Sequence, residues 1–194
     1  MEDREFIRRE KVPMTKEEVR SVSLSCLELY RAKRLLDIGA GSGSVVLEAL
    51  ITFPNLEATA VEMKEDALET IRENVVHLEE TKGISIADRL EIVEGKAPVE
   101  LEKTFDAIFV GGTAGDVGDI IRWTKKLLND GGVMVMNFVT VENYYEAMRL
   151  LKQDEGFMDF RGIQLAVNRL APLAKYTILK PENPIWILCV RKGA

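Results

Sequence analysis

The sequence predicts a single α/β domain whose core is a mostly parallel sheet with helices on both faces. Strand-like apolar runs alternate with amphipathic helical runs, a glycine-rich turn joins the first such strand to the following helix, and 194 residues suit one core. Strands that are separated by helices pair in parallel through right-handed crossovers. We therefore expect one domain over residues 1–194, without internal repeats or interdomain linkers.

The spacing of apolar and charged residues defines the central elements. The stretch 65–80 is typical of a helix, because Ala67, Leu68, Ile71 and Val75 recur at helical spacing between charged positions. The same criteria predict strands at 34–40, 56–63, 89–95, 105–112 and 133–139, and further helices at 44–53, 118–128 and 142–153.

An extension precedes the first strand. Residues 13–30 predict a helix, with Thr15 and Glu18 at the spacing of a capping box. We expect residues 1–33 to form an N-terminal extension whose helix lies over the site at the glycine turn.

The C-terminal part changes from alternation to two successive strand-like runs, 160–170 and 184–192. A connection that contains prolines, with no helix-length pattern, separates the two runs. We expect an antiparallel hairpin over 160–192 that closes one side of the sheet. Both alternations of residues 162–174 are apolar, which indicates either a subunit contact or a strand buried on both sides.

Composition argues against several function classes. A net charge of −6 disfavours general affinity for nucleic acid, although Arg8, Arg9, Lys11 and Lys16 form a local basic cluster. No apolar run approaches the roughly 20 residues of a membrane span, and residues 1–12 lack the apolar core of a signal peptide. We therefore expect a cytoplasmic protein that interacts with neither nucleic acid nor membrane.

The chain has two cysteines and one histidine, which is a poor set for a metal site. Cys26 and Cys189 each lie in an apolar pattern, and His77 lies on a charged helical stretch. We expect buried, reduced thiols and no metal site.

The turn after the first strand reads DIGAGSGS, and its charges bear on the choice of ligand. Gly39, Gly41 and Gly43 follow Asp37, and Ser44 stands where a dinucleotide site usually has its third glycine. A carboxylate at the strand tip would repel a diphosphate, whereas S-adenosylmethionine carries an ammonium and a sulfonium. The Gly-Lys-Ser/Thr of a phosphate-binding loop does not follow. The turn therefore favours S-adenosylmethionine over a nicotinamide dinucleotide.

Two further strand ends supply possible contacts with the same ligand. Glu62 ends the second strand about 20 residues after the glycine turn, where a carboxylate can accept hydrogen bonds from ribose hydroxyls. EGKAP follows the third strand, and backbone groups of Gly95, Lys96 and Ala97 could meet the adenine edge. Ligands of parallel α/β sheets bind outside the carboxyl ends of the strands, so we expect these segments to form one site.

These motifs together resemble class I S-adenosylmethionine-dependent methyltransferases, which have a Rossmann-like, seven-stranded sheet with an antiparallel last strand. The likeness extends to the decarboxylating cobalt-precorrin-6B C15-methyltransferase family of anaerobic cobalamin biosynthesis. It rests on PMTKEEVR at 13–20, DIGAGSGSVVLEA at 37–49, VGGTAG at 110–115 with NFVTVEN at 137–143, and ENPIW at 182–186. The resemblance implies methylation of C15, decarboxylation of the C12 acetate and a homotetramer.

The resemblance also implies roles for matching positions. Thr15 would help to hold the cofactor, Gly39 to Gly43 would wrap its methionine part, and Glu62 would bind its ribose. Glu62 stands where the family also uses Asp, and Lys96 departs from the commoner acid at its position. The complete cofactor-binding set is Thr15, Asp37, Gly39, Ala40, Gly41, Ser42, Gly43, Glu62, Met63, Gly95, Lys96 and Ala97.

The substrate side is predicted at VGGTAG, where Gly111, Gly112 and Gly115 leave room for a flat tetrapyrrole. The Asn/Asp-Pro-Pro-aromatic segment of many base-amino methyltransferases does not stand there. Substrate-binding candidates are Gly111, Gly112, Thr113, Asn137 and Arg169, and the unassigned catalytic residue has Thr113, Glu142 and Tyr144 as candidates.

A cobalt-precorrin carries acetate and propionate arms, which cations must meet. The candidate cations are Arg8, Arg9, Lys11, Arg161, Arg169 and Lys175. Three alternatives stay open: a methyltransferase acting on another small molecule, on RNA or on protein; a nicotinamide-dependent oxidoreductase, which Asp37 and Ser44 oppose; and a module that binds the cofactor without chemistry.

Overall fold

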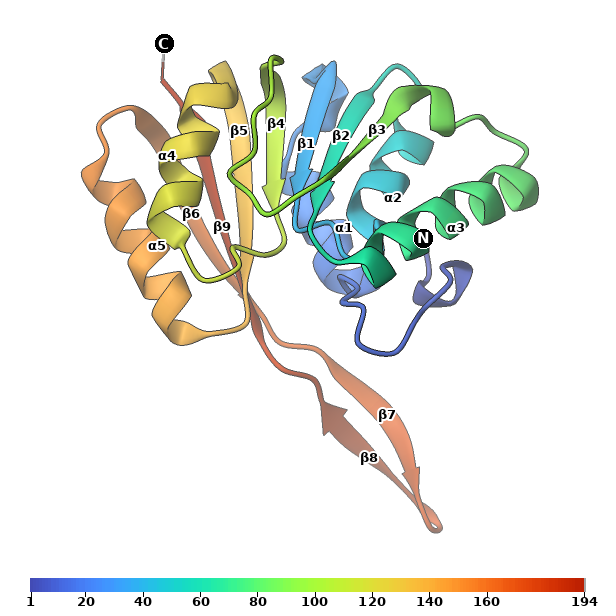
Figure 1. The fold of residues 1–194 in the computed structure, drawn as a ribbon. Coiled ribbons are helices and arrows are strands. Elements are labelled where there is room, and N and C mark those ends of the chain that lie inside the picture. The colour runs from blue at the N-terminus through green and yellow to red at the C-terminus, as the bar shows by residue number, and fades with distance from the viewer. Residues whose placement is uncertain (194) are drawn as a thin grey trace.

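The computed structural model describes residues 1–193, and these form an α/β body from which a slender arm projects (Figure 1). The body contains a seven-stranded sheet in the order β3-β2-β1-β4-β5-β9-β6. Strands β1 to β5 pair in parallel, and β9 runs antiparallel to both of its neighbours. The predicted sheet with its antiparallel last strand is therefore confirmed. The strands of the sheet are β1 (Arg34–Ile38), β2 (Glu57–Glu62), β3 (Leu90–Glu94), β4 (Phe105–Val110), β5 (Leu128–Phe138), β6 (Phe157–Leu165) and β9 (Ile185–Lys192).

The helices divide between the two faces of this sheet. One face is covered by α1 (Glu17–Cys26), α2 (Ser44–Thr52) and α3 (Glu65–Lys82), and the other by α4 (Val117–Leu127) and α5 (Val141–Gln153). Each is too short or too polar to traverse a lipid bilayer, and this holds for every helix within residues 1–193.

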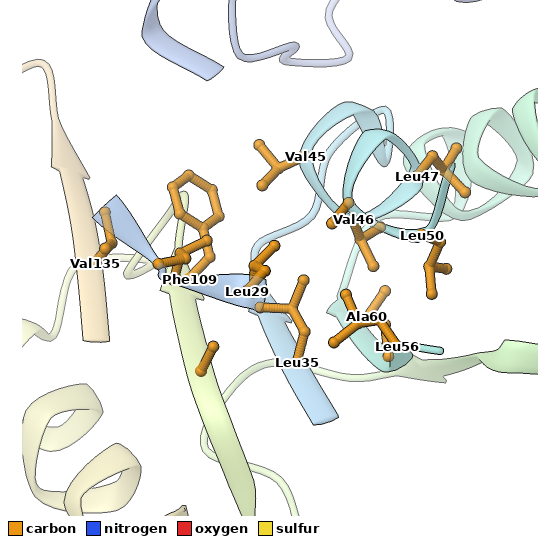
Figure 2. Close-up of a cluster of buried hydrophobic side chains, with 14 of the residues drawn as sticks. Leu29, Leu35, Val45, Val46, Leu47, Leu50, Leu56, Ala60, Phe109 and Val135 are labelled. Atoms are coloured by element: carbon orange, nitrogen blue, oxygen red, sulfur yellow. The ribbon is translucent and has the colours of Figure 1, made fainter. Parts of the chain in front are cut away.

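Adjacent residues of β1 pack into two different cores. Leu35 lies in the cluster that includes Val46 and Leu50 of α2 (Figure 2), whereas Leu36 lies in the cluster beneath α4 and α5. Both leucines are fully buried, and each contributes about 1.5–3 kcal/mol of transfer free energy. Burial on both faces explains the nearly continuous apolar runs of the parallel strands.

The N-terminal extension forms the expected helix, but the helix is shorter than predicted. α1 begins at Glu17, and its N-cap residue is Lys16, which makes no side-chain capping hydrogen bond. The predicted capping box of Thr15 and Glu18 is therefore wrong.

Contacts of residues 13–16 with the glycine turn and with Arg20 explain the late start of α1. Residues 13–16, called the strap below, are non-helical and lie against the glycine turn. The Pro13 carbonyl accepts a hydrogen bond from the Ser42 amide at 2.9 Å, and the Thr15 carbonyl accepts one from the Arg20 guanidinium at 2.6 Å. These bonds keep the strap extended up to the first residue of α1.

The antiparallel pairing predicted for the C-terminal hairpin is confirmed, but the predicted boundaries of its strands are wrong. β6 and β9 pair antiparallel, but the predicted strand at 160–170 divides between β6 and a new strand, β7 (Asn168–Leu173). Within residues 1–193, β7 pairs only with β8 (Tyr176–Pro181), and residues 168–181 form the arm, drawn in orange to brown in Figure 1. Both strands of a two-stranded sheet are edges, so Pro172 and Pro181 are tolerated there.

Candidate active site

The glycine turn between β1 and α2 is tightly enclosed. Gly39, Gly41 and Gly43 have φ values of +68°, +57° and +77°, in the left-handed region. A Cβ atom on Gly41 would overlap the Pro13 carbonyl oxygen, and one on Gly39 would lie 2.9 Å from the Gly112 nitrogen. The turn therefore needs glycine for its conformation and for its close contacts.

The carboxylate of Glu62, at the end of β2, organises this turn. Its Oε2 accepts a hydrogen bond from the Gly41 amide at 2.9 Å, and its Oε1 accepts from the amides of Met63 at 2.8 Å and Lys64 at 3.0 Å. The side chain is only 7% exposed. An ionised carboxylate offers about four acceptor positions, so roughly one remains for a hydroxyl of a ligand.

Asp37, near the end of β1, is a buried acid without a partner. Neither of its carboxylate oxygens accepts a hydrogen bond within residues 1–193. Burial raises the pKa of Asp37 to about 7; the nearby Val46 amide opposes the rise, and the charge of Glu62 adds to it. Because an unpartnered buried carboxylate is costly, this position favours a neighbouring positive charge.

Two adjoining clefts open where the parallel strands end. They share Pro13, Gly39, Gly41 and Gly111. The first, called the β2 cleft, has a volume of about 200 Å³ and is also lined by Glu62, Met63, Lys64, Lys96, Ala97 and Thr113. The second, called the β5 cleft, has a volume of about 340 Å³ and is also lined by Thr15, Lys16, Asn137, Leu165, Glu182 and Ile185. This edge is where open α/β sheets bind their ligands.

A hydrogen bond between α1 and β5 orients one polar group of the β5 cleft. The Asn137 Nδ2 donates to Ser23 Oγ at 2.9 Å, and Ser23 is fully buried. The amide of Asn137 is therefore held in place from the helix that covers the cleft.

Comparison with known proteins identifies the family. A family model for the precorrin methyltransferase domain matches residues 7–192. The chain belongs to this family. The cobalt-precorrin-6B C(15)-methyltransferase (decarboxylating) of Salmonella typhimurium is 38% identical over 192 residues, which cover 99% of this chain and 96% of that relative.

Solved structures agree with membership of the precorrin methyltransferase family. The precorrin-6Y C5,15-methyltransferase of Geobacter metallireducens has a TM-score of 0.84 and 33% identity, and covers 99% of this chain and 97% of its own. The precorrin 8W decarboxylase of Methanobacterium thermoautotrophicum has a TM-score of 0.83 and 27% identity over 100% of both chains.

Most site residues predicted for this precorrin methyltransferase line the two clefts. The β2 cleft collects the predicted residues of three strand ends, and the β5 cleft collects those of the strap and β5. Asp37, Ser42 and Gly43 are buried behind the cleft walls. The predicted residues on the walls are Thr15, Gly39, Ala40, Gly41, Glu62, Met63, Gly95, Lys96, Ala97, Gly111, Gly112, Thr113 and Asn137.

Three candidates lie off the cleft walls. Glu142 is exposed near the start of α5. Tyr144 stacks on Trp186, with ring centroids 5.7 Å apart. The Arg169 guanidinium, at the base of the arm, donates to Glu182 at 2.5 Å and to Glu18 at 2.9 Å, so glutamates already neutralise it.

The cations proposed from the sequence for the substrate carboxylates do not line the clefts, and other cations do. Arg9 pairs with glutamates of α3, and Arg161 contacts Cys26 on the α1 side of the sheet. Lys16 lies on the β5 cleft and Lys64 on the β2 cleft, and sequence reasoning assigned neither to the site. Lys64 follows Glu62, the acid at the end of β2, by two positions. This position next to a predicted site residue was a basis for predicting Lys64 as well.

Proposed function

We propose that this chain transfers a methyl group from S-adenosylmethionine to C15 of cobalt-precorrin-6B and releases carbon dioxide from the C12 acetate. The observation that carries the proposal is the pair of clefts that meet at a glycine turn flanked by two acidic side chains, Asp37 and Glu62. The full-length similarity to the Salmonella enzyme of that name supports the choice of substrate.

The residues around the turn fit a positively charged nucleoside. Glu62 keeps acceptor capacity for a ribose hydroxyl on the wall of the β2 cleft. The unpartnered Asp37 carboxylate favours a cationic group at the turn, and two buried acids disfavour a diphosphate. When bound, S-adenosylmethionine supplies an electrophilic methyl group on its sulfonium. Gly95 to Ala97 border the same cleft, and we assign them to the adenine edge.

We assign the macrocycle to the β5 cleft. Its walls combine apolar side chains such as Leu165 and Ile185 with the oriented amide of Asn137. Gly111 lies on both clefts and has no side chain, and Gly112 next to it has open space in front of its Cα. A flat substrate can therefore approach the junction of the two clefts without meeting a side chain at these positions.

The substrate carboxylates need cations at the rim. Lys16 borders the β5 cleft, and Lys64 and Lys96 border the β2 cleft. Within residues 1–193, Lys64 and Lys96 form no ion pair. We assign Lys16 and Lys64 to the acetate and propionate arms, and Lys96 contributes only its backbone, at the adenine edge.

Alignment is the main contribution of the chain to this reaction. The conjugated macrocycle is itself the nucleophile, so the walls of the clefts need to hold its carbon close to the methyl group. Among the three catalytic candidates, Thr113 lies on a cleft wall, and we retain it as the hydroxyl that contacts the substrate.

We also propose that the chain forms a homotetramer, as the family resemblance implies. The apolar side chains of the arm support this, because they find no cover within residues 1–193. A second copy of the chain is the occupant that would bury them. Those that are more than a third exposed are Leu170, Leu173, Tyr176, Ile178 and Leu179.

Calorimetric titration of the purified chain with S-adenosylmethionine, S-adenosylhomocysteine and NAD tests the cofactor. We expect binding of the first two, no binding of NAD, and a loss of at least about tenfold in affinity in Glu62→Ala. Glu94→Ala is the matched control, because Glu94 pairs with Glu62 in the β2–β3 register but is exposed. Binding of NAD alone would overturn the assignment.

A second assay tests the substrate. Incubation with cobalt-precorrin-6B and the cofactor should yield a product that has gained one methyl group and lost one carbon dioxide, as shown by mass spectrometry. Cofactor binding without any change in the substrate mass would leave the fold assignment intact and refute the proposed substrate.

A further inference from the structure

The two cysteines of the chain lie together on the α1 side of the sheet, outside the clefts. Cys26 is the last residue of α1 and Cys189 lies on β9, and both are buried and free. Both border a single cavity of about 260 Å³. Two thiols from distant parts of the sequence therefore share one space that a small molecule can enter.

Arg161 of β6 lies beside both thiols. Its Nη2 donates a hydrogen bond to Cys26 Sγ at 3.1 Å, and Cys189 lines the same cavity. Arg161 and Cys189 are direct partners in the β6–β9 register, so strand pairing itself brings the guanidinium to the thiol.

The other guanidinium at this cavity, that of Arg191, is already paired with two carboxylates. Arg191 donates to Glu28 at 2.7 Å and to Asp159 at 3.1 Å. Within the described chain, Arg161 forms no ion pair with a carboxylate, and its side-chain hydrogen bond goes to the Cys26 sulfur. Its positive charge is therefore available to a thiolate.

The pKa values of the two thiols shift in opposite directions. A hydrogen bond from Cys189 and the positive charge of Arg161 lower the pKa of Cys26 to about 6, against the opposing effect of burial. The same hydrogen bond and burial raise the pKa of Cys189 well above its usual range. Cys26 is therefore the more readily ionised of the two, and the thiolate is the reactive form of cysteine.

We propose that Cys26 and Cys189 form a peroxide-sensitive dithiol, in which Cys26 reacts first and Cys189 closes a reversible disulfide. The Cys26 sulfur attacks one oxygen of hydrogen peroxide, the O–O bond breaks, and hydroxide leaves and takes a proton from solvent. The Cys189 sulfur then attacks the resulting sulfenic acid, the S–O bond breaks, and the thiol proton departs with the hydroxyl as water. Two thiols are oxidised, and one peroxide is reduced to two waters.

The disulfide would join the C-terminal end of α1 to β9. Along β9, Cys189 lies three residues beyond Trp186, which pairs with Phe138 beside the β5 cleft. Three residues of strand span about 10 Å, so the dithiol is separate from the cleft. Oxidation should therefore raise the midpoint of thermal unfolding by restraining α1, and should leave the cleft walls in place.

Peptide mapping of the full chain tests the proposal. Reduced protein is treated with equimolar hydrogen peroxide and digested without reductant. We expect a peptide cross-linked through Cys26 and Cys189, the joint loss of both free thiols, and recovery of both with dithiothreitol. Cys189→Ser should stop at a Cys26 sulfenic acid that dimedone traps, and Cys26→Ser should leave Cys189 unmodified.

The role of Arg161 is tested separately by alkylation kinetics. Arg161 is exposed at the surface, so Arg161→Gln should fold, and it should slow the iodoacetamide reaction of Cys26 at pH 7 at least about threefold. Arg149→Gln, an exposed arginine on α5, is the matched control and should leave the rate unchanged. Thiols that stay unmodified in the folded chain, disulfides only between separate chains, or an unchanged rate in Arg161→Gln would each overturn the proposal.

Discussion

The glycine turn and the arm are stabilised in opposite ways. At the turn, the Gly41 amide donates a hydrogen bond to Glu62, and the Pro13 carbonyl packs against Gly41. Both neighbours belong to the same chain. In the arm, the cross-strand partners Leu170 and Leu179 are 76% and 65% exposed. The turn is complete within one chain, whereas the apolar surface of the arm has no cover within residues 1–193. Substitutions should therefore act on folding and cofactor binding at the turn, and on assembly in the arm.

The largest effect is expected for Gly41→Ala. A Cβ there would overlap the Pro13 carbonyl oxygen, and the residue would also have to keep φ at +57°. The conformation alone costs about 1–2 kcal/mol, and displacement of the strap should lower cofactor affinity by at least about tenfold. Urea unfolding and calorimetry measure both quantities.

Gly83→Ala is the control for this substitution. Gly83 has a similar φ of +66°, but a Cβ there meets no atom within 4 Å. We expect a loss of only about 1 kcal/mol in the free energy of unfolding, with unchanged cofactor affinity. Equal losses in the two variants would show that the strap does not press on the turn.

The next largest effect concerns the pH dependence of stability. Burial raises the pKa of Asp37 from 3.8 to about 7, so the folded chain retains a proton that the unfolded chain releases. This contribution is complete below about pH 4 and is lost as the pH rises through about 7. Between about pH 5 and pH 8, the parent chain should lose roughly 2–3 kcal/mol of unfolding free energy. Asp37→Asn should not show this loss.

Urea titrations at the two pH values, without cofactor, measure this difference. Asp88→Asn, at an exposed aspartate, should show the same loss as the parent chain. If Asp37→Asn also lost stability to the same extent, Asp37 would not be the group responsible.

A smaller effect is expected at Asn74 of α3, which ties the N-terminal extension to the turn. Its Nδ2 donates to the carbonyls of Ile7 at 3.1 Å and Ser42 at 3.0 Å, and its Oδ1 accepts from the Ile7 amide at 2.6 Å. Asn74→Ala leaves buried backbone groups without partners and should cost about 2 kcal/mol of unfolding free energy. Asn55→Ala, at an exposed turn, should change it by less than about 0.5 kcal/mol.

The smallest effect on the folding of one chain is expected in the arm. Leu170→Ser combined with Leu179→Ser removes apolar surface that is already exposed, so the unfolding free energy of the monomer should change by less than about 0.5 kcal/mol. Light scattering after size exclusion should show a smaller assembly than the proposed tetramer. An unchanged assembly would show that the arm does not hold the copies together.

Short-range patterns predicted most of the fold and much of the candidate site. The strand ending at Asp37, the glycines after it and the acid at Glu62 are separated by only a few residues or one helix, and their order along parallel strands brings them to one edge. The burial of Cys26 and Cys189 was likewise predicted from their apolar neighbours and is confirmed. The assignments of single residues to cofactor and substrate stay predictions.

Errors arose where a partner comes from a distant part of the chain. Thr15 has the spacing of a cap, but the strap that contains it is held at Pro13 by the Ser42 amide of the glycine turn. Arg169 was proposed for the substrate, but its guanidinium meets Glu18, which lies 151 positions away in the sequence.

The sequence by itself determined the order of strands and helices, the glycine turn and the acids at the strand ends, because periodicity and turn chemistry act over a few residues. Only the tertiary structure decided that the strap closes the turn, that β7 and β8 leave the sheet as an arm, and that Arg161 meets the Cys26 thiol. The physical reason is that ion pairs, hydrogen bonds and exposed apolar surface depend on which distant side chains arrive at the same place. Short-range sequence patterns carry no information about these long-range contacts.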